Sequence, residues 1–415
     1  MRIDVAYGDK KETVEVPDHK VGEIVLPNEL PSMDEASVIR HALANPLGSV
    51  GLSEFLEGAR SVLVIVNDAT RPTPTARIMG EIHASLRDLD AKYIVATGMH
   101  AAPTEEEYRF IFGDAYDDIS SKVISHDSKE STMVRLGRTS RGTEVRMNSI
   151  IQEVDRIVVI GSVEPHYFAG YTGGRKAFIP GISAYETIEQ NHKLALSLDA
   201  QALRLDGNPV HEDMMEAMRF LTDKDVFSIM AVLDRDHKTC AAFSGGLRES
   251  FDAAVEKADK VFVVPLKGKA EIVVAVTSFP HDIDLYQSQK ALDNAKYAVK
   301  EGGIVILVSA CRKGVGPDTF LKLLASAETP GQALEKIAEG YKLGYHKAAK
   351  MAEIGLDRKL YAVTTLDAET ARKAHLIPMA SVQEALDSAM KEMDEDAKVT
   401  FIMDAVITVP KIEPC

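Results

Sequence analysis

Three of the twelve histidines, His100, His166 and His192, lie in polar segments that could support catalysis. Imidazole binds nickel or zinc and carries protons near neutral pH, so these residues are candidates for metal binding or acid–base chemistry. A single histidine is more often a hydrogen-bonded structural residue, but three in such segments favour a functional site. His126, which stands between Ser125 and Asp127, is instead expected at the surface.

The segment that joins His166 to His192 contains a glycine turn with Gly170, Gly173 and Gly174. Glycine permits positive φ angles and lets backbone amides closely approach an anion such as a phosphate. The spacing of Gly-Gly-Arg-Lys differs from that of a Walker A loop, and no Ser or Thr follows the lysine. The alternative for these glycines is a tight structural turn.

Lys176 follows this turn and precedes the apolar residues Ala177, Phe178 and Ile179. A partly desolvated lysine loses proton affinity and becomes a nucleophile for a carbonyl or acyl carbon. The sequence therefore offers Lys176 as a site of covalent attachment, with an ordinary surface lysine as the alternative.

Arg71 has the planar fork that matches a carboxylate, and the nearby prolines stiffen its loop. Asp68 either orients this arginine or caps a turn, and the sequence leaves both roles open. Gln287 and Lys290 stand three residues apart, on one face if the stretch is helical. They either contact a ligand or belong to a solvated helix face.

Short β-branched runs alternate with helical stretches, which predicts an α/β protein with largely parallel sheets. The predicted strands are Val62–Val66, Tyr93–Ala96, Ile157–Ile160, Val261–Val264, Ile272–Val276 and Ile304–Val308. Helices are predicted from a capping box at Ser32 to Ala44, and over Gln287–Lys300 with a stop at Gly302-Gly303. Polar clusters follow several strands, and ligands bind beyond the carboxyl ends of such strands, so these clusters are expected to form one site.

The chain has 415 residues, for which two domains are the natural expectation. We predict one α/β domain over residues 1–265 and a second over residues 266–398, and it is left open whether residues 399–415 return to the first. The sequence does not indicate the oligomeric state.

The composition excludes several classes of protein. The formal charge of −15 argues against a nucleic-acid or anionic-membrane surface, and no apolar run approaches 18 residues. Only three cysteines occur, so a disulfide framework or thiolate metal site is not expected. The first residues do not look like a signal peptide, and we expect a cytoplasmic protein.

The sequence resembles the nickel-pincer-dependent lactate racemase family over most of its length. The resemblance is carried by four motifs in the family's order: Asp68-Ala69-Thr70-Arg71-Pro72, Thr97-Gly98-Met99-His100, the block from His166 to His192, and Tyr286-Gln287-Ser288-Gln289-Lys290. It implies a two-domain α/β fold with the active site in the cleft between the domains, and it implies inversion of a 2-hydroxy acid at C2. The implied cofactor is a nickel-pincer nucleotide of the pyridinium-3,5-bisthiocarboxylic acid mononucleotide type, which cofactor-biosynthesis proteins would load.

The resemblance also implies roles for individual residues. Lys176 would be joined to the cofactor through a thioamide, His192 would complete the nickel coordination, and His100 and His166 would be the acid/base pair. Arg71 would hold the substrate carboxylate. The remaining implied contacts are Tyr286, Gln287 and Lys290 for the substrate, and Asp68, Thr70, Gly170, Gly173 and Gly174 for the cofactor.

The implied chemistry explains why two histidines are needed. Hydride removal onto an electron-poor pyridinium avoids a high-energy dianion, while one histidine takes the hydroxyl proton and leaves a planar 2-keto acid. A base is needed for each enantiomer. Ala101 stands where lactate-acting relatives are expected to carry a basic residue, and Ala69 occupies a variable place, so the substrate could be another 2-hydroxy acid or a sugar acid.

Two alternative functions would use some of the same residues. A zinc hydrolase could use His100, His166 and His192 as ligands, with water in the fourth position, but this leaves Lys176 and the glycine turn without a role. A non-catalytic protein could bind the nickel nucleotide to carry or sense it, although a carrier has no use for two bases.

Overall fold

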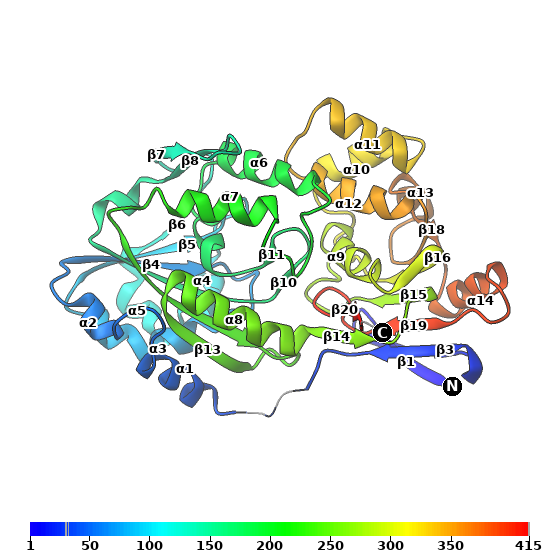
Figure 1. Ribbon diagram of the computed structural model, residues 1–415, viewed down its shortest axis with the longest axis horizontal. Helices are drawn as coiled ribbons and strands as arrows, with labels where there is room; N and C mark the ends of the chain where they lie inside the picture. The colour runs from blue at the N-terminus through cyan, green and yellow to red at the C-terminus, as the bar shows by residue number, and fades with distance from the viewer. Residues whose placement is uncertain (30, 32, 414–415) are drawn as a thin grey trace. The chain divides into compact units, whose positions relative to one another are not determined.

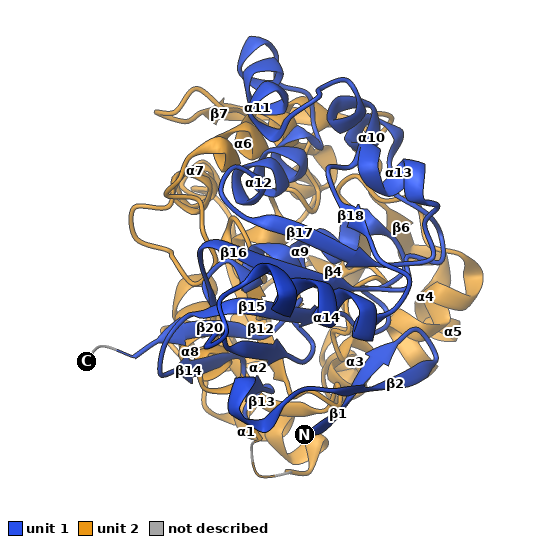
Figure 2. Cartoon of the chain, turned by 90° about the vertical axis from the view of Figure 1, so that its right-hand side faces the viewer, with its two compact units in different colours: residues 1–28, 262–415 blue, residues 29–261 orange. Residues whose placement is uncertain are grey.

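The computed structural model describes residues 1–29, 31 and 33–413, and it divides the chain into two compact units. Unit 1 comprises residues 1–28 and 262–415, and unit 2 comprises residues 29–261 (Figure 2). Both units combine helices with a mainly parallel six-stranded sheet, which confirms the predicted fold class. Within the described ranges, no helix is long and apolar enough to cross a membrane.

The sheet of unit 2 has the strand order β13-β12-β9-β4-β5-β6. Figure 1 labels β4, β5, β6 and β13 of this sheet. Its strands are β4 (Ser61–Asn67), β5 (Asp90–Ala96), β6 (Val123–Ser125), β9 (Arg156–Ser162), β12 (Asp225–Leu233) and β13 (Thr239–Gly246). All neighbours are parallel except β12 and β13. Residues 62–66 of β4 are completely buried, as expected for a parallel strand covered on both faces.

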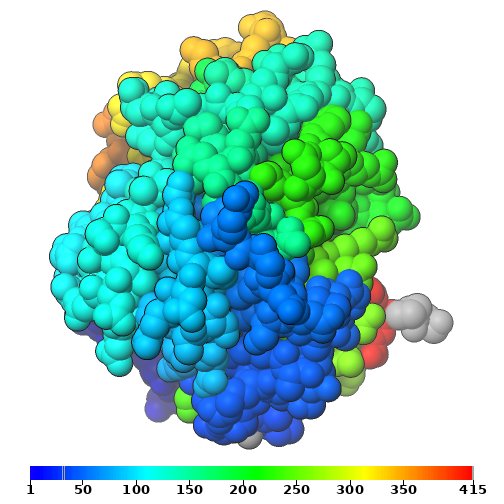
Figure 3. Space-filling model, turned by 90° about the vertical axis from the view of Figure 1, so that its left-hand side faces the viewer, coloured from blue at the N-terminus to red at the C-terminus, as the bar shows by residue number. Residues whose placement is uncertain are grey.

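Helices cover one face of this sheet around a shared apolar core. They are α1 (Glu35–Ala44), α2 (Leu52–Leu56), α3 (Thr75–Leu86), α4 (Glu105–Phe112) and α5 (Tyr116–Ile119). Figure 3 shows the outer surface of this layer, where the blue segments around α1 to α3 adjoin the cyan segments that carry α4 and α5.

The opposite face of the sheet carries the glycine turn and α8 (Leu247–Phe262). The amide of Gly174 donates to Met230 Sδ on β12 over 3.2 Å, and the Ser228 hydroxyl bonds to that of Ser250 on α8. The other elements of unit 2 are α6 (Tyr185–Lys193), α7 (Pro209–Met218) and the strand pairs β7 (Met133–Arg138) with β8 (Glu144–Asn148) and β10 (Pro165–His166) with β11 (Gly170–Tyr171).

Unit 1 has a wholly parallel sheet in the order β18-β17-β16-β15-β19-β3. Its strands are β3 (Val21–Val25), β15 (Ala270–Val276), β16 (Val299–Val308), β17 (Lys359–Val363), β18 (Ile377–Pro378) and β19 (Val399–Ile402). One face packs on the hairpin of β1 (Arg2–Tyr7) and β2 (Lys10–Glu15) and on α14 (Val382–Glu392). The remaining elements are α9 (Leu285–Ala295), α10 (Asp318–Ala325), α11 (Pro330–Glu339), α12 (Tyr345–Gly355), α13 (Ala368–Lys373), β14 (Val263–Leu266) and β20 (Val409–Ile412).

The structure places the two ends of the chain differently from the sequence-based division. Residues 1–28 belong to unit 1, because β3 pairs with β19 at the edge of that sheet. Residues 399–413 also stay in unit 1, where β19 pairs with β15 and β20 pairs with β14. Such pairing between distant segments is set by the assembled sheet and not by the local sequence pattern.

Five of the six predicted strands lie within β4, β5, β9, β15 and β16. The prediction for Val261–Val264 was partly wrong, because α8 continues to Phe262 and β14 begins only at Val263. The predicted helix stop at Gly302-Gly303 was also wrong: α9 ends at Ala295, and both glycines lie inside β16. Helix α1 begins at Glu35 with Asp34 as its N-cap, and Ser32 lies outside the described residues.

Candidate active site

The carboxyl ends of three neighbouring parallel strands in unit 2 carry several of the predicted site residues. Strands β5, β4 and β9 lie side by side in that order, so their carboxyl ends share one edge of the sheet. Asp68 and Arg71 follow β4, His100 follows β5, and His166 follows β9. The predicted meeting of polar clusters at one sheet edge is confirmed for these three strands.

Asp68 holds His100 by a short hydrogen bond. Asp68 Oδ2 lies 2.6 Å from His100 Nδ1, and the aspartate side chain is 7% exposed while the histidine is 51% exposed. Burial would raise the pKa of the Asp68 carboxyl, but its hydrogen bonds to His100 and Thr70 and the charges of His100 and Arg71 lower it overall. A carboxylate accepts hydrogen bonds, so His100 carries a proton on Nδ1 and, when neutral, has its lone pair on Nε2.

Asp68 also caps the turn that leads to Arg71. Its Oδ1 accepts hydrogen bonds from the amide of Thr70 at 3.1 Å and from the Thr70 hydroxyl at 2.6 Å. The sequence left open whether Asp68 orients Arg71 or caps a turn, and these hydrogen bonds show that it caps the turn. The guanidinium of Arg71 instead pairs with Glu164, whose Oε1 lies 3.0 Å from Arg71 Nη1.

His166 and Lys176 lie together beside an aromatic ring. Lys176 Nζ lies 3.4 Å from His166 Nε2 and 5.4 Å from the centre of the Phe168 ring. The His166 ring packs edge-on against Phe168 at 4.5 Å, and the side of His166 opposite the lysine is engaged, since its Nδ1 accepts the amide of Ala169 at 3.3 Å. When Nδ1 accepts this amide, a neutral His166 carries its proton on Nε2, and this tautomer holds only while Lys176 Nζ does not donate to Nε2.

His192, on α6, packs against the same Phe168 ring. Its ring centre lies 5.1 Å from that of Phe168. Burial, followed by the positive charge of Lys176, lowers the pKa of His192 to about 3. His192 is therefore neutral throughout the physiological range, and neutral imidazole is the form that binds a metal ion.

Protein atoms pack closely against each of the three glycines of the turn. A Cβ at Gly170 would lie 2.4 Å from the carbonyl oxygen of Arg204, and one at Gly173 would lie 2.7 Å from Val163. All three glycines have positive φ, and a Cβ at Gly174 would lie 3.0 Å from Phe251. The packing and the backbone conformation by themselves account for glycine here.

The fully buried guanidinium of Arg175 organises the carbonyl groups of this turn. It donates to the carbonyl oxygens of Ala169 at 2.6 Å, Tyr171 at 2.9 Å, Gly173 at 3.2 Å and Thr172 at 3.4 Å. The turn that precedes Lys176 is thus fixed from inside the protein.

Tyr286, Gln287 and Lys290 lie on the first turns of α9, in unit 1. The backbone amide of Gln287 donates to Oδ1 of the N-cap residue Asp284 over 2.7 Å. Burial and then the charge of Asp284 raise the pKa of Tyr286 to about 12. The Nζ of Lys347, on α12, lies 3.8 Å from the centre of the Tyr286 ring and donates to the Tyr286 carbonyl.

Sequence reasoning missed Glu164 and Lys347 as partners of site residues. Glu164 stood in a polar cluster after a strand, which was a usable signal, whereas the position of Lys347 gave none. The expectation for His126 was wrong, because this residue is 1% exposed. Its Nε2 bonds to the Ser183 carbonyl at 3.0 Å and its Nδ1 to Asn148 at 3.3 Å, so it is a structural histidine.

Family models match most of the chain. The lactate racemase N-terminal domain matches residues 7–203, and the lactate racemase C-terminal domain matches residues 266–409. The chain belongs to the lactate racemase family. Its relatives in that family are racemases, which places this chain among the isomerases.

Two curated lactate racemases align with nearly the whole chain. The protein of Thermoanaerobacterium thermosaccharolyticum is 28% identical over 422 residues, which cover 98% of each chain. The protein of Lactiplantibacillus plantarum is 28% identical over 423 residues, which cover 99% of each chain.

Solved structures agree with this assignment. The lactate racemase apoprotein of T. thermosaccharolyticum matches with a TM-score of 0.92 at 28% identity, over 99% of this chain and 100% of that one. A Thermotoga maritima protein matches with a TM-score of 0.73 at 17% identity, over 92% of this chain and 99% of that one, which shows a shared fold.

The resemblance noted in the sequence implies a nickel nucleotide, and the residues at Lys176 are chemically suited to such a group. Lys176 and the neutral imidazole of His192 offer one attachment point and one metal ligand near the same aromatic ring. Among residues 1–29, 31 and 33–413, no three His, Cys, Asp or Glu side chains are grouped to hold a metal ion. A metal bound at His192 would therefore take its other donors from the bound group.

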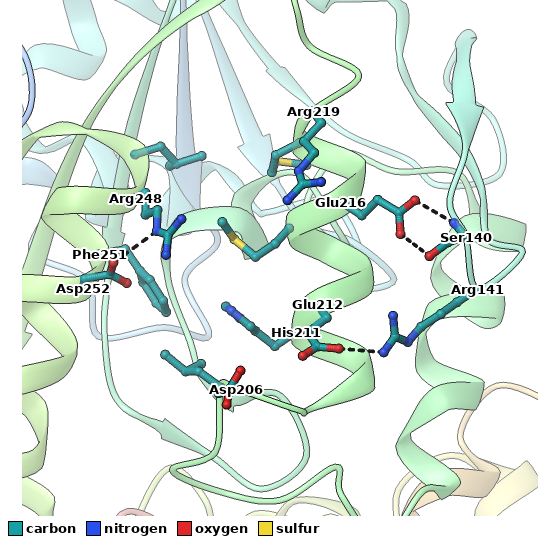
Figure 4. Close-up of a pocket in the computed structure, with 14 residues that line it drawn as sticks. Ser140, Arg141, Asp206, His211, Glu212, Glu216, Arg219, Arg248, Phe251 and Asp252 are labelled. Carbon is teal, nitrogen blue, oxygen red and sulfur yellow. Dashed lines mark hydrogen bonds and ion pairs between the residues drawn. The ribbon is translucent and has the colours of Figure 1, made fainter.

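A separate hollow of about 1050 Å³ lies in unit 2, beside α7 and α8 (Figure 4). His211 and Phe251 stack on one another in its wall at 6.3 Å, and Arg175 lies 4.6 Å behind the Phe251 ring. The residues predicted for the active site do not line this hollow. The candidate site is thus the strand-end cluster and not this pocket.

Proposed function

We propose that this protein inverts the C2 centre of a 2-hydroxy acid, as its lactate racemase relatives are named for doing with lactate. The observation that carries the proposal is the pair of histidines that follow β5 and β9, the strands on either side of β4. His100 has its lone pair on Nε2, and His166 has its Nε2 beside Lys176. A racemase needs one group to take the hydroxyl proton and another to return a proton when the opposite enantiomer forms.

We propose that a nickel-pincer nucleotide is the cofactor, with Lys176 as its covalent attachment point and His192 as the protein ligand to nickel. When bound, this group supplies the acceptor and donor of the C2 hydride. Gly170, Gly173 and Gly174 fix the backbone that presents Lys176. Asp68 and Thr70 were predicted as cofactor contacts, and they are hydrogen-bonded to each other. We propose that their main role is to position His100, which is bonded to Asp68.

The side chains of the protein then have separate tasks. His100 Nε2 accepts the hydroxyl proton of one enantiomer, and His166 does so for the other. Arg71 holds the substrate carboxylate while the C2 oxygen changes position, and Tyr286, Gln287 and Lys290 are the proposed substrate contacts of unit 1. General acid–base assistance of this kind contributes about 10²–10⁴-fold to the rate.

The substrate is a small 2-hydroxy acid, for which lactate is the reference compound. Ala69 and Ala101 alter the space and charge near Arg71 and His100, so a related 2-hydroxy acid or a sugar acid belongs in the same test panel. We further propose that cofactor-biosynthesis proteins load the nucleotide, and that the protein acts in the cytoplasm.

The alternatives meet specific difficulties. A zinc hydrolase built on His100, His166 and His192 requires three converging ligands, and the described part of the chain contains no such group. His100 instead bonds to Asp68. A protein that only carries the nickel nucleotide would not need the short Asp68–His100 hydrogen bond, which orients His100 for proton transfer.

Intact-mass analysis and racemisation assays of the cofactor-loaded protein test the proposal. The wild-type protein should carry a covalent adduct and convert either enantiomer of at least one 2-hydroxy acid into an equal mixture. Lys176→Ala should lose the adduct, whereas Lys193→Ala, at an exposed lysine on α6, should keep it. An adduct-bearing protein that inverts no member of a broad panel would refute the racemase function.

A further inference from the structure

Glu164 holds the arginine that we assign to the substrate carboxylate. The side chains of Glu164 and Arg71 are 16% and 27% exposed, and their charged atoms lie 3.0 Å apart. Both are largely shielded from water, so their charges are screened less than those of a surface pair. A carboxylate that approaches Arg71 therefore meets a guanidinium that already has an anionic partner.

The backbone on both sides of this ion pair is anchored. The Glu164 amide donates to Thr172 Oγ1 over 2.9 Å, and the Thr172 amide donates to the Glu164 carbonyl over 2.8 Å. The Arg71 amide donates to the Asp68 carbonyl over 3.2 Å. Glu164 comes after β9 and Arg71 comes after the adjacent strand β4. Neither residue can therefore move along with the other without disturbing the edge of the sheet.

Two carboxylates of the protein, Glu164 and Asp68, already interact with the charge of Arg71. Arg71 retains N–H groups beyond Nη1, which suffice for one carboxylate. The other nearby cationic candidate, His100, is bound to Asp68, and the next residue is Ala101. A second carboxylate on the substrate would face the negative charge of Glu164 at short range.

We propose that Glu164 is a specificity-determining residue: it fixes Arg71 to bind one carboxylate and disfavours 2-hydroxy acids with a second anionic group. This inference rests on the proposed function, because it takes Arg71 as the substrate-binding residue. Like charges a few ångströms apart in a partly shielded site repel enough to change relative affinity on the order of 10-fold.

Relative activity on lactate and malate tests the proposal in the cofactor-loaded enzyme. Glu164→Gln should raise the malate-to-lactate ratio of kcat/KM about 10-fold, while kcat on lactate falls because Arg71 loses its anchor. Glu164→Asp keeps the charge and should keep the wild-type ratio. The matched control is Glu81→Gln, because Glu81 also pairs with an arginine, Arg40, at 3.0 Å in unit 2, with 24% of its side chain exposed.

Calorimetric titration of the unloaded full-length protein with lactate and with malate separates this inference from the proposed function. Glu164→Gln should strengthen malate binding relative to lactate binding whether or not the loaded enzyme racemises either acid. An unchanged ratio in Glu164→Gln, matching that of Glu81→Gln, would overturn the proposal. An equal loss for both acids would also overturn it, since Glu164 would then only maintain the local structure.

Discussion

His100 and His166 have the same proposed task but opposite surroundings. His100 is half-exposed and bonds through Nδ1 to a buried carboxylate, whereas His166 is 8% exposed and receives a backbone amide hydrogen at Nδ1. The carboxylate fixes a proton on Nδ1 of His100, and the amide fixes a lone pair on Nδ1 of His166. The neutral rings thus carry their protons on opposite nitrogens.

This difference indicates how two identical side chains can start in complementary states. The Nε2 of His100 is ready to accept a proton, while the Nε2 of neutral His166 is ready to donate one. A racemase alternates between these states in the two directions of its reaction, so under the proposed function the protein would begin with one base and one acid in place.

Removal of either ring should produce the largest effect. We expect His100→Ala and His166→Ala each to lower kcat by about 10²–10⁴-fold, because each removes one proton-transfer group. Since the equilibrium constant between enantiomers is one, kcat/KM should fall equally in both directions, measured by chiral chromatography. His41→Ala, at an exposed position on α1, is the control. Full activity of His100→Ala in both directions would exclude the two-base scheme.

Removal of the carboxylate should reduce the difference between the two histidines. Asp68→Asn keeps the shape but cannot fix the proton on Nδ1 of His100, so we expect kcat to fall roughly 10–100-fold, less than for loss of the ring. The adduct on Lys176 should remain by intact mass, because Asp68 acts through His100. Loss of the adduct in Asp68→Asn would instead make Asp68 a cofactor-binding residue.

A change in the glycine turn, which adjoins His166, should lower the free energy of unfolding of the protein. Gly173→Ala places a Cβ 2.7 Å from Val163 at a φ of +79°, and we expect a loss of about 1–3 kcal/mol in the free energy of unfolding. Gly142→Ala, with a φ of +90° and no atom within 4 Å of the added Cβ, should cost less because only the backbone is strained. Chemical denaturation measures both, and equal losses would show that packing against Val163 contributes nothing.

The smallest effect concerns pH. The Asp68 pKa is lowered in the folded state, so its contribution to stability is present above the ordinary carboxyl pKa of about 4 and is lost as the pH falls through the lowered value. The melting temperature of Asp68→Asn should therefore approach that of the wild-type protein below pH 4. A difference in melting temperature that does not depend on pH would contradict this linkage.

The sequence predicted the strand ends well because long apolar runs identify buried parallel strands, and such strands meet at one edge. It could not predict that Arg71 pairs with Glu164, since this requires the side-by-side placement of β4 and β9. The assignment of residues 1–28 to unit 1 depends on the pairing of β3 with β19, which local patterns do not encode. His126 was misplaced because its hydrogen-bond partners, Ser183 and Asn148, are distant in sequence.

The protonation of the two imidazole rings tests the central claim most directly. Nitrogen-15 NMR of the full-length protein, assigned with His100→Ala and His166→Ala, reports which ring nitrogen carries the proton. We predict a proton on Nδ1 for neutral His100 and on Nε2 for neutral His166. The same tautomer at both histidines would contradict the account.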